Sequence, residues 1–183
     1  MKRMYFAGIA MLVAATSVFA QTPAGNFDAA LAAAPRQMRD GAMVIKWKAD
    51  GTYETLRPGT NRLVCYDQSG EAAEQPFSSQ CTSVGNLDRV KQNKIYEAKE
   101  PDNAKRNALL AELEKSGERV KPEFGSVFYT FSGKDQATAR LHVTIAVPGA
   151  TTASLGLPDN NKMGGAWIMG AGTTGAHIMT PGS

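Results

Sequence analysis

Residues 141–147 read Leu-His-Val-Thr-Ile-Ala-Val, and they decide the fold because their side chains alternate more regularly than any others in the chain. The odd positions are apolar, whereas the even positions include His142 and Thr144, and a period of two is typical of a half-buried strand. Just upstream, Val127–Phe131 is largely apolar on both alternating sides, as expected for a central strand. The polar residues 132–136 between them predict an antiparallel hairpin.

Further short strands are predicted on both sides of this hairpin. They span Met43–Lys48, Tyr53–Leu56, Leu63–Tyr66, Ala166–Met169 and Ala176–Met179. The first two flank Asp50-Gly51, a pair that favours a type I′ turn because both of its positions need a positive φ. Residues 68–80 are polar and are predicted to form a loop.

Two amphipathic helices are predicted in the middle of the chain. In Val84–Lys99, the residues Leu87, Val90, Lys94, Ile95 and Ala98 recur near the helical period. After Pro101, Asp102 or Asn103 can cap a second helix that ends at Gly117. Strands on either side of a helical block indicate an α+β fold, a mostly antiparallel sheet covered by these two helices.

The N-terminus has the layout of a secretory signal peptide over residues 1–20. Lys2 and Arg3 precede an apolar run, and Val18-Phe19-Ala20 resembles a cleavage site. The apolar run is shorter than the roughly twenty residues of a membrane anchor. We therefore expect a signal peptide, a flexible lead with a short helix over residues 21–40, and a single domain over residues 41–183, located in the periplasm or secreted.

Removal of this segment also removes most of the net charge. The remaining 18 Lys and Arg residues face 17 Asp and Glu residues, so the mature chain carries about one positive charge instead of three. A nearly neutral surface without a basic cluster is a poor match to a phosphate backbone. Nucleic acid is therefore not the expected partner.

Cys65 and Cys81 are the only cysteines in the chain. Two cysteines in an exported protein favour a disulfide, since conditions outside the cytosol are oxidising. A bridge across the fifteen intervening residues would stabilise the fold by roughly 3 kcal/mol in the chain-entropy model. Catalytic or metal-binding thiols are the competing interpretation, but no C-x-x-C motif is present.

Residues 170–175 spell G-x-G-x-x-G, the pattern of a dinucleotide-binding loop. That function needs a following helix and an acidic residue about twenty positions later. Only eight residues follow, they include Pro181, and none is Asp or Glu. The glycines instead predict a tight hairpin loop.

His142 and His177 are the only histidines, and both fall on predicted strands. If those strands are neighbours, the two rings could hold a divalent transition metal together with a carboxylate such as Asp135 or Asp159, or they could act as an acid–base pair. A structural, hydrogen-bonded histidine on a strand is the alternative. Asp159-Asn160-Asn161 lacks the alternating ligands of a calcium loop and favours a turn.

No catalytic motif identifies a reaction, because the chain has neither a G-x-S-x-G nor an S-x-x-K sequence. Trp47 and Trp167 are expected to pack on the sheet, or to form an aromatic platform for sugars or peptides. Whether the protein is an enzyme therefore stays open from its residues alone.

Several segments together resemble an uncharacterised family of exported bacterial proteins. They are Arg57-Pro58-Gly59-Thr60-Asn61 before Cys65, then Leu155-Gly156-Leu157-Pro158, and the C-terminal run from Ala166-Trp167-Ile168-Met169 through Gly172-Thr173 to His177-Ile178-Met179. Histidine also stands in the family pattern at the positions of His142 and His177. The resemblance implies export and one small domain, and no established activity.

These observations lead to two hypotheses. In the first, the protein is a soluble extracytoplasmic domain that binds a small ligand or another component of the cell envelope. In the second, it is an envelope enzyme or metal-binding protein that uses His142 and His177. The two differ in whether the histidine rings and an acid lie within reach of one shared ligand.

Overall fold

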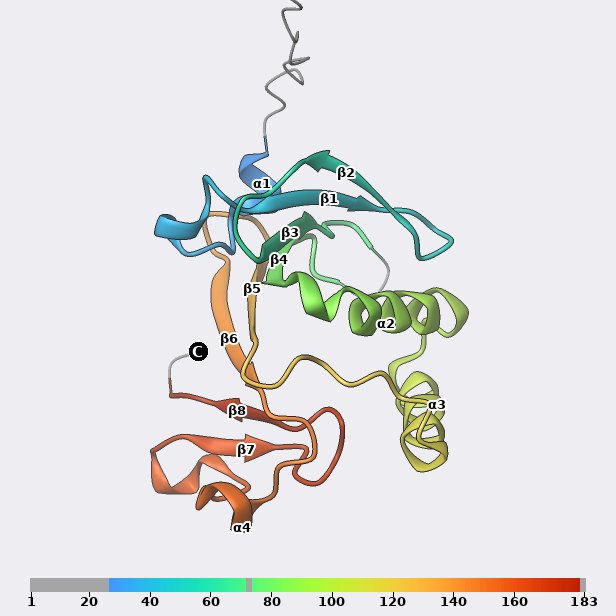
Figure 1. Ribbon diagram of the computed structural model, residues 1–183, viewed down its shortest axis with the longest axis vertical. Coiled ribbons are helices and arrows are strands. Elements are labelled where there is room, and N and C mark those ends of the chain that lie inside the picture. Colours follow the sequence, from blue (N-terminus) through green and yellow to red (C-terminus); the bar gives the residue numbers. More distant parts are fainter. Residues whose placement is uncertain (1–26, 72–73, 182–183) are drawn as a thin grey trace, which may run out of the picture.

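The computed structural model describes residues 27–71 and 74–181 and shows one sheet of eight strands (Figure 1). The strand order is β2-β1-β3-β4-β5-β6-β8-β7, and among these described strands β1 with β3 is the one parallel pair. The strands are β1 (Met43–Trp47), β2 (Tyr53–Arg57), β3 (Leu63–Asp67), β4 (Phe77–Ser83), β5 (Val127–Gly133), β6 (Arg140–Ala146), β7 (Trp167–Met169) and β8 (His177–Met179). The predicted α+β fold with a mostly antiparallel sheet is confirmed. The predicted signal peptide, its cleavage site and the lead up to Asn26 lie outside the described residues.

The helices are α1 (Asp28–Leu31), α2 (Leu87–Lys99), α3 (Asn103–Ser116) and α4 (Thr152–Leu155). Asp102 caps α3, since its carboxylate accepts a hydrogen bond from the backbone N–H of Lys105 at 2.9 Å. Gly117 ends the helix with a φ of 78°, the left-handed conformation that glycine adopts without strain. Both ends of α3 therefore agree with the prediction.

The two faces of the sheet are covered by different elements. On the face that α2 covers, here called the α2 face, Val90 packs with Ile45, Val64 and Tyr66. On the opposite face, α1 packs against Val44 and other buried residues of β1, β3 and β4. Because both faces are covered, Val44 and Ile45 are both buried, and β1 is not the half-buried strand that its alternation suggests.

The second predicted helix does not share in this covering. None of the residues of α3 is buried, and the helix lies beyond the end of α2, away from the strands (Figure 1). Leu109, Leu110 and Leu113, its apolar stripe, are only half-buried. Of the two central helices, α2 is therefore the one that packs on the sheet.

Two local predictions need correction. The β1–β2 turn is not of type I′, because Gly51 has a positive φ (76°) and Asp50 does not. Asp50 instead accepts hydrogen bonds from the backbone and hydroxyl of Thr52, and Lys48 pairs with Thr52 around a three-residue loop. The predicted loop over residues 68–80 is shorter than expected, since Phe77 already begins β4.

The disulfide between Cys65 and Cys81 is confirmed. The two cysteines are direct partners in the antiparallel register of β3 and β4, and both side chains are fully buried. The bridge therefore ties together two neighbouring strands in the middle of the sheet.

The C-terminal third adds the last two strands beside β6. Ile168, Val147, Ala150 and Ala176 form a separate buried cluster there, with α4 nearby. Residues 170–175 join the antiparallel strands β7 and β8, and Gly170 and Gly172 have positive φ values of 67° and 82°. The glycine motif thus serves a hairpin, as predicted.

None of the helices within residues 27–71 and 74–181 is both long enough and apolar enough to cross a lipid bilayer.

Candidate functional site

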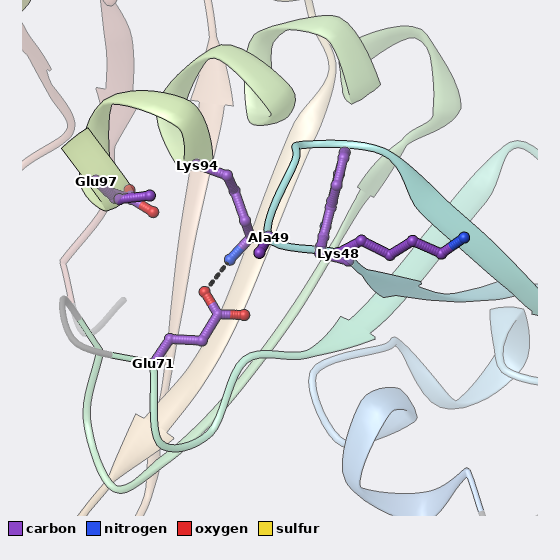
Figure 2. A pocket seen from close by; sticks show the side chains of 7 residues that line it. Lys48, Ala49, Glu71, Lys94 and Glu97 are labelled. Atoms are coloured by element: carbon purple, nitrogen blue, oxygen red, sulfur yellow. Dashed lines mark hydrogen bonds and ion pairs between the residues drawn. The ribbon is translucent and has the colours of Figure 1, made fainter.

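A cleft of about 340 Å³ lies beneath the C-terminal half of α2, beside the β1–β2 turn and the segment that follows β3 (Figure 2). We call it the Trp47 cleft. It is lined by Trp47, Lys48, Ala49, Glu71, Lys94, Glu97 and Ala98. Three segments that are distant in the sequence therefore contribute to one site.

Trp47 forms an aromatic wall of the cleft at the end of β1. Its ring meets Tyr53 and Tyr66 edge to face, with centroid distances of 5.5 and 5.8 Å. Between these two rings the indole is fixed in one orientation. Its Nε1 is buried and has no hydrogen-bond partner among the described residues.

Lys94 points from α2 toward the floor of the cleft, and its charge is already satisfied. The ammonium pairs with the carboxylate of Glu71, lies 3.4 Å from Oε1 of Gln68, and stands 5.6 Å from the centre of the Tyr66 ring. The side chain is only 10% exposed. The ion pair therefore leaves little positive charge for a ligand to meet.

Acidic groups outnumber cationic groups around this pair. Burial, together with the charges of Glu74, Glu97 and Glu71, raises the pKa of Tyr66 well above its usual value. Burial also raises the pKa of Glu74, and the hydrogen bond from Ser78 and the charge of Lys94 only partly offset this. Figure 2 shows Glu97 projecting from α2 on the side of Lys94, whereas the ammonium of Lys48 points away from the cleft. The interior of the cleft is therefore net negative.

A row of polar side chains crosses the α2 face from the cleft to His142. Tyr66, Gln80, Thr130 and His142 are register partners on four successive strands. The hydroxyl of Tyr66 donates to Oε1 of Gln80, and Nε2 of Gln80 donates to Oγ1 of Thr130 at 3.0 Å. His142 stands at the far end of this row, on β6, three strands away from Tyr66 on β3.

The two histidines lie on neighbouring strands, but the structure does not bring them together. His177 pairs with Ala146 in β6. His142 lies four residues before Ala146, which corresponds to about 13 Å along the strand. Both belong to the α2 face because they occupy positions of equal parity.

The carboxylates considered as their partners are engaged elsewhere. Asp135 accepts hydrogen bonds from the backbone and hydroxyl of Thr138, and Asp159 accepts one from Asn160. Within residues 27–71 and 74–181, no group of three or more His, Cys, Asp or Glu side chains is arranged to hold a metal ion. The histidine pair and its proposed acids thus do not form one site in this fold.

Sequence reasoning missed the cleft, although one signal was present. Lys94 occupies the apolar stripe of its helix, where a charged side chain must find a partner when the helix packs. The partner, Glu71, lies in a segment whose position depends on the fold of β3 and β4. Trp47 packs on the sheet against Tyr53 and Tyr66, as one of its two predicted roles requires, and its ring also lines the cleft.

The fold and the cleft define an α+β domain with a cross-strand disulfide and a small charged cleft beside its main helix. In comparisons with protein-family models, with curated proteins and with solved structures, nothing matches this chain.

Proposed function

We propose that this protein is a soluble extracytoplasmic binding module and that the Trp47 cleft takes a small organic cation, such as an amine or a quaternary ammonium compound. Its location outside the cytosol is supported by the signal-like residues 1–20 and by the disulfide, which persists in oxidising compartments. The class of ligand is argued from the cleft itself.

The observation that carries this proposal is the pairing of an aromatic wall with an acid that forms no hydrogen bond or ion pair among the described residues. Trp47 offers a π surface, and Glu97 lines the same cleft without a hydrogen bond or ion pair to the described residues. The negative face of an indole attracts a cation by about 0.5–2 kcal/mol, and more as water is removed. A carboxylate beside the ring adds to that attraction.

Lys94 does not oppose such a ligand. Its ammonium is held by Glu71 and lies against the Tyr66 ring, so an entering cation meets a neutralised pair and the free charge of Glu97. The side chains of Ala49 and Ala98 supply apolar contact for the carbon part of the ligand.

The proposal is tested by titrating choline against the fluorescence of Trp47. In a Trp167→Phe background, Trp47 is the single tryptophan. We expect choline to change its emission with a dissociation constant in the millimolar range, about −4 kcal/mol. The neutral carbon isostere 3,3-dimethylbutan-1-ol has the same shape without the charge, so it should bind at least several-fold more weakly.

Two variants assign the effect to the cleft. Glu97→Gln should weaken choline binding by about three- to tenfold, since it removes one nearby charge. Glu118→Gln removes the same charge from an exposed residue after α3 and should leave binding unchanged. Equal binding of choline and its neutral isostere, or equal loss in both variants, would contradict the proposal.

A further inference from the structure

A second pocket, of about 210 Å³, lies near the N-terminal end of α2. We call it the Arg89 pocket. Arg89 and Asn93 line it from α2, Thr144 lines it from β6, and Gly175 and His177 line it from the glycine-rich loop and β8. Its residues therefore include one of the two histidines and Gly175, the last glycine of the G-x-G-x-x-G motif.

Arg89 is only partly used by the protein. Its Nη1 donates to the carbonyl of Val120 at 2.6 Å and to Oγ1 of Thr174 at 3.0 Å. In the part of the chain that the structure describes, Nε and Nη2 donate no hydrogen bond. These two groups form the edge of a guanidinium that matches the two oxygens of a carboxylate.

Gly175 leaves the Nη2 side of this group uncovered. A Cβ at Gly175 would lie 3.4 Å from Nη2 of Arg89. A larger side chain at this position would therefore cover the guanidinium. The glycine is not required by a positive φ, because residue 175 does not have one.

Positive charge exceeds negative charge around the pocket. Arg119 is 7% exposed and donates to Gln92 and Asn93, which are neutral. The charge of Glu114 acts on both arginines, and the charge of Glu97 acts on Arg119, but the two oxygens of Glu114 accept hydrogen bonds from the backbone and hydroxyl of Thr174, each at 2.6 Å. Among the described residues, no ion pair within 4.0 Å includes either arginine.

The arginines remain charged despite their burial. Burial and the charge of Arg119 lower the pKa of Arg89 to about 10, and the charge of Glu114 only partly offsets this. At neutral pH the group is thus still protonated. Arg89 and Arg119 are both partly desolvated, and neither belongs to an ion pair among the described residues, so a bound anion would stabilise them.

His177 supplies a different kind of contact. Its Nδ1 lies 2.8 Å from the carbonyl oxygen of Gly175, which can only accept a hydrogen bond, so Nδ1 carries the proton. In the neutral ring, Nε2 is then the acceptor. A ligand hydroxyl or amine can donate to it.

We infer that the Arg89 pocket binds a small hydroxy or amino carboxylic acid. The carboxylate pairs with Nε and Nη2 of Arg89, and the hydroxyl or amine of the same ligand donates to Nε2 of His177. This site is separate from the Trp47 cleft, and it does not rest on the function proposed for that cleft.

The test is a calorimetric titration of the purified protein with lactate, propanoate and phosphate at low ionic strength. Lactate carries both groups, propanoate lacks the hydroxyl, and phosphate lacks the planar carboxylate. We expect lactate to bind about tenfold more tightly than propanoate and more tightly than phosphate. Absence of lactate binding, or tighter binding of phosphate, would overturn the inference.

Three variants locate the site. Arg89→Gln should weaken lactate binding by about tenfold or more, while Lys105→Gln, which removes one charge from an exposed position of α3, should not. Gly175→Val should also weaken it, because the side chain covers Nη2 without removing a charge, and this variant keeps the test valid if Arg89→Gln does not fold.

His177→Ala gives a readout that a merely structural role would not produce. It should reduce the affinity for lactate to that for propanoate and leave the affinity for propanoate unchanged. An equal loss for both ligands would show that His177 does not recognise the hydroxyl. Choline titration of the same variants separates this site from the Trp47 cleft, since failure at one site does not alter binding at the other.

Discussion

The two ends of α2 carry pockets of opposite charge, although both open on the same face of the sheet. Near its N-terminal end, Arg89 lines a pocket whose lining residues include no acid. Near its C-terminal end, Glu97 lines a cleft from which the ammonium of Lys48 points away, so that Glu71 and Glu97 face Lys94 there (Figure 2). The residues at positions 89, 93 and 97 follow at intervals of four and therefore lie along one side of the helix. One amphipathic helix can thus pack on a sheet and still present two distinct chemical environments.

At each end of α2, the helix dipole favours a ligand of the same charge as the side chains of that pocket do. The N-terminal end of a helix favours anions and its C-terminal end favours cations, each by about 0.3–1 kcal/mol near the first or last turn. The arginine pocket and the acidic cleft follow that order. The dipole therefore adds to a pattern that the side chains establish.

The pKa values of two glutamates are shifted in opposite directions near the two ends of α2. Burial alone would raise the pKa of Glu114, but the hydrogen bonds from Thr174 and the charges of Arg89 and Arg119 outweigh it, and the pKa is lowered. At the other end of α2, burial raises the pKa of Glu74. The same type of side chain is favoured as an anion at one end and disfavoured at the other.

The largest expected effect comes from removing the cation that balances the acidic cleft. Lys94→Ala leaves Glu71, Glu74 and Glu97 close together without their buried partner, and we expect it to lower the free energy of unfolding by about 3 kcal/mol. Lys91→Ala removes a charge from an exposed position one turn earlier and should change the free energy of unfolding by less than about 0.5 kcal/mol. Chemical denaturation at pH 7 measures both values, and similar values for the two variants would show that the cleft is not acidic enough to need Lys94.

The fold was largely predictable because its strands carry local signals. The alternation in β6 and the apolar β5 define the central hairpin, and the cysteines were paired correctly from composition and expected compartment. The strand β4 was not predicted, because residues 77–80 read Phe-Ser-Ser-Gln, which resembles a loop until β3 and β5 supply partners on both sides. Hydrogen bonding to neighbours outweighed the weak strand propensity of these polar residues.

The binding pockets were not predictable, since each depends on contacts between distant segments. Arg89 meets Thr174 across 85 positions of sequence, and Lys94 meets Glu71 across 23. The histidines illustrate the opposite problem. Their strands are neighbours as supposed, but the register of β6 and β8, which the residues do not encode locally, separates His142 from His177. The periodicity of a strand predicts the face of the sheet on which a side chain lies, whereas the register between two strands determines which residue lies beside it.

Removing the charge of Glu74 or of Glu114 should have a smaller effect on the free energy of unfolding, and the two effects should be opposite in sign. A carboxyl whose pKa is raised by folding opposes the folded state once it is ionised, so Glu74→Gln should stabilise the protein at pH 7. A carboxyl whose pKa is lowered contributes stability above its unfolded pKa and loses it as the pH falls through its folded pKa. Glu114→Gln should therefore destabilise the protein at pH 7.

Both effects should be below about 1 kcal/mol, because solvent screens groups that are partly exposed. Below the ordinary pKa of glutamate, Glu74 is protonated in the folded and unfolded states, and the effect of Glu74→Gln should vanish. The effect of Glu114→Gln should vanish only at a lower pH, below its folded pKa. Thermal unfolding of both variants from pH 3 to pH 7 measures this, and shifts of the same sign would remove the contrast between the two ends.

The smallest effect is expected when each pocket is probed with the variant of the other. The backbone positions of Arg89 and Glu97 are eight residues apart, about 12 Å along the helix axis. This exceeds the Debye length of about 8 Å at physiological ionic strength, so salt weakens the interaction between the two charges, although less than for fully exposed groups. Arg89→Gln should therefore change choline binding by less than about twofold, and Glu97→Gln should change lactate binding equally little.

Lowering the ionic strength should enlarge both of these cross-effects. Choline should then bind more tightly to Arg89→Gln, and lactate more tightly to Glu97→Gln, because each variant lacks a distant charge that repels the ligand. A cross-effect as large as the local one at physiological salt would mean that α2 moves as one unit between the pockets and that their opposite charges belong to a single, coupled site.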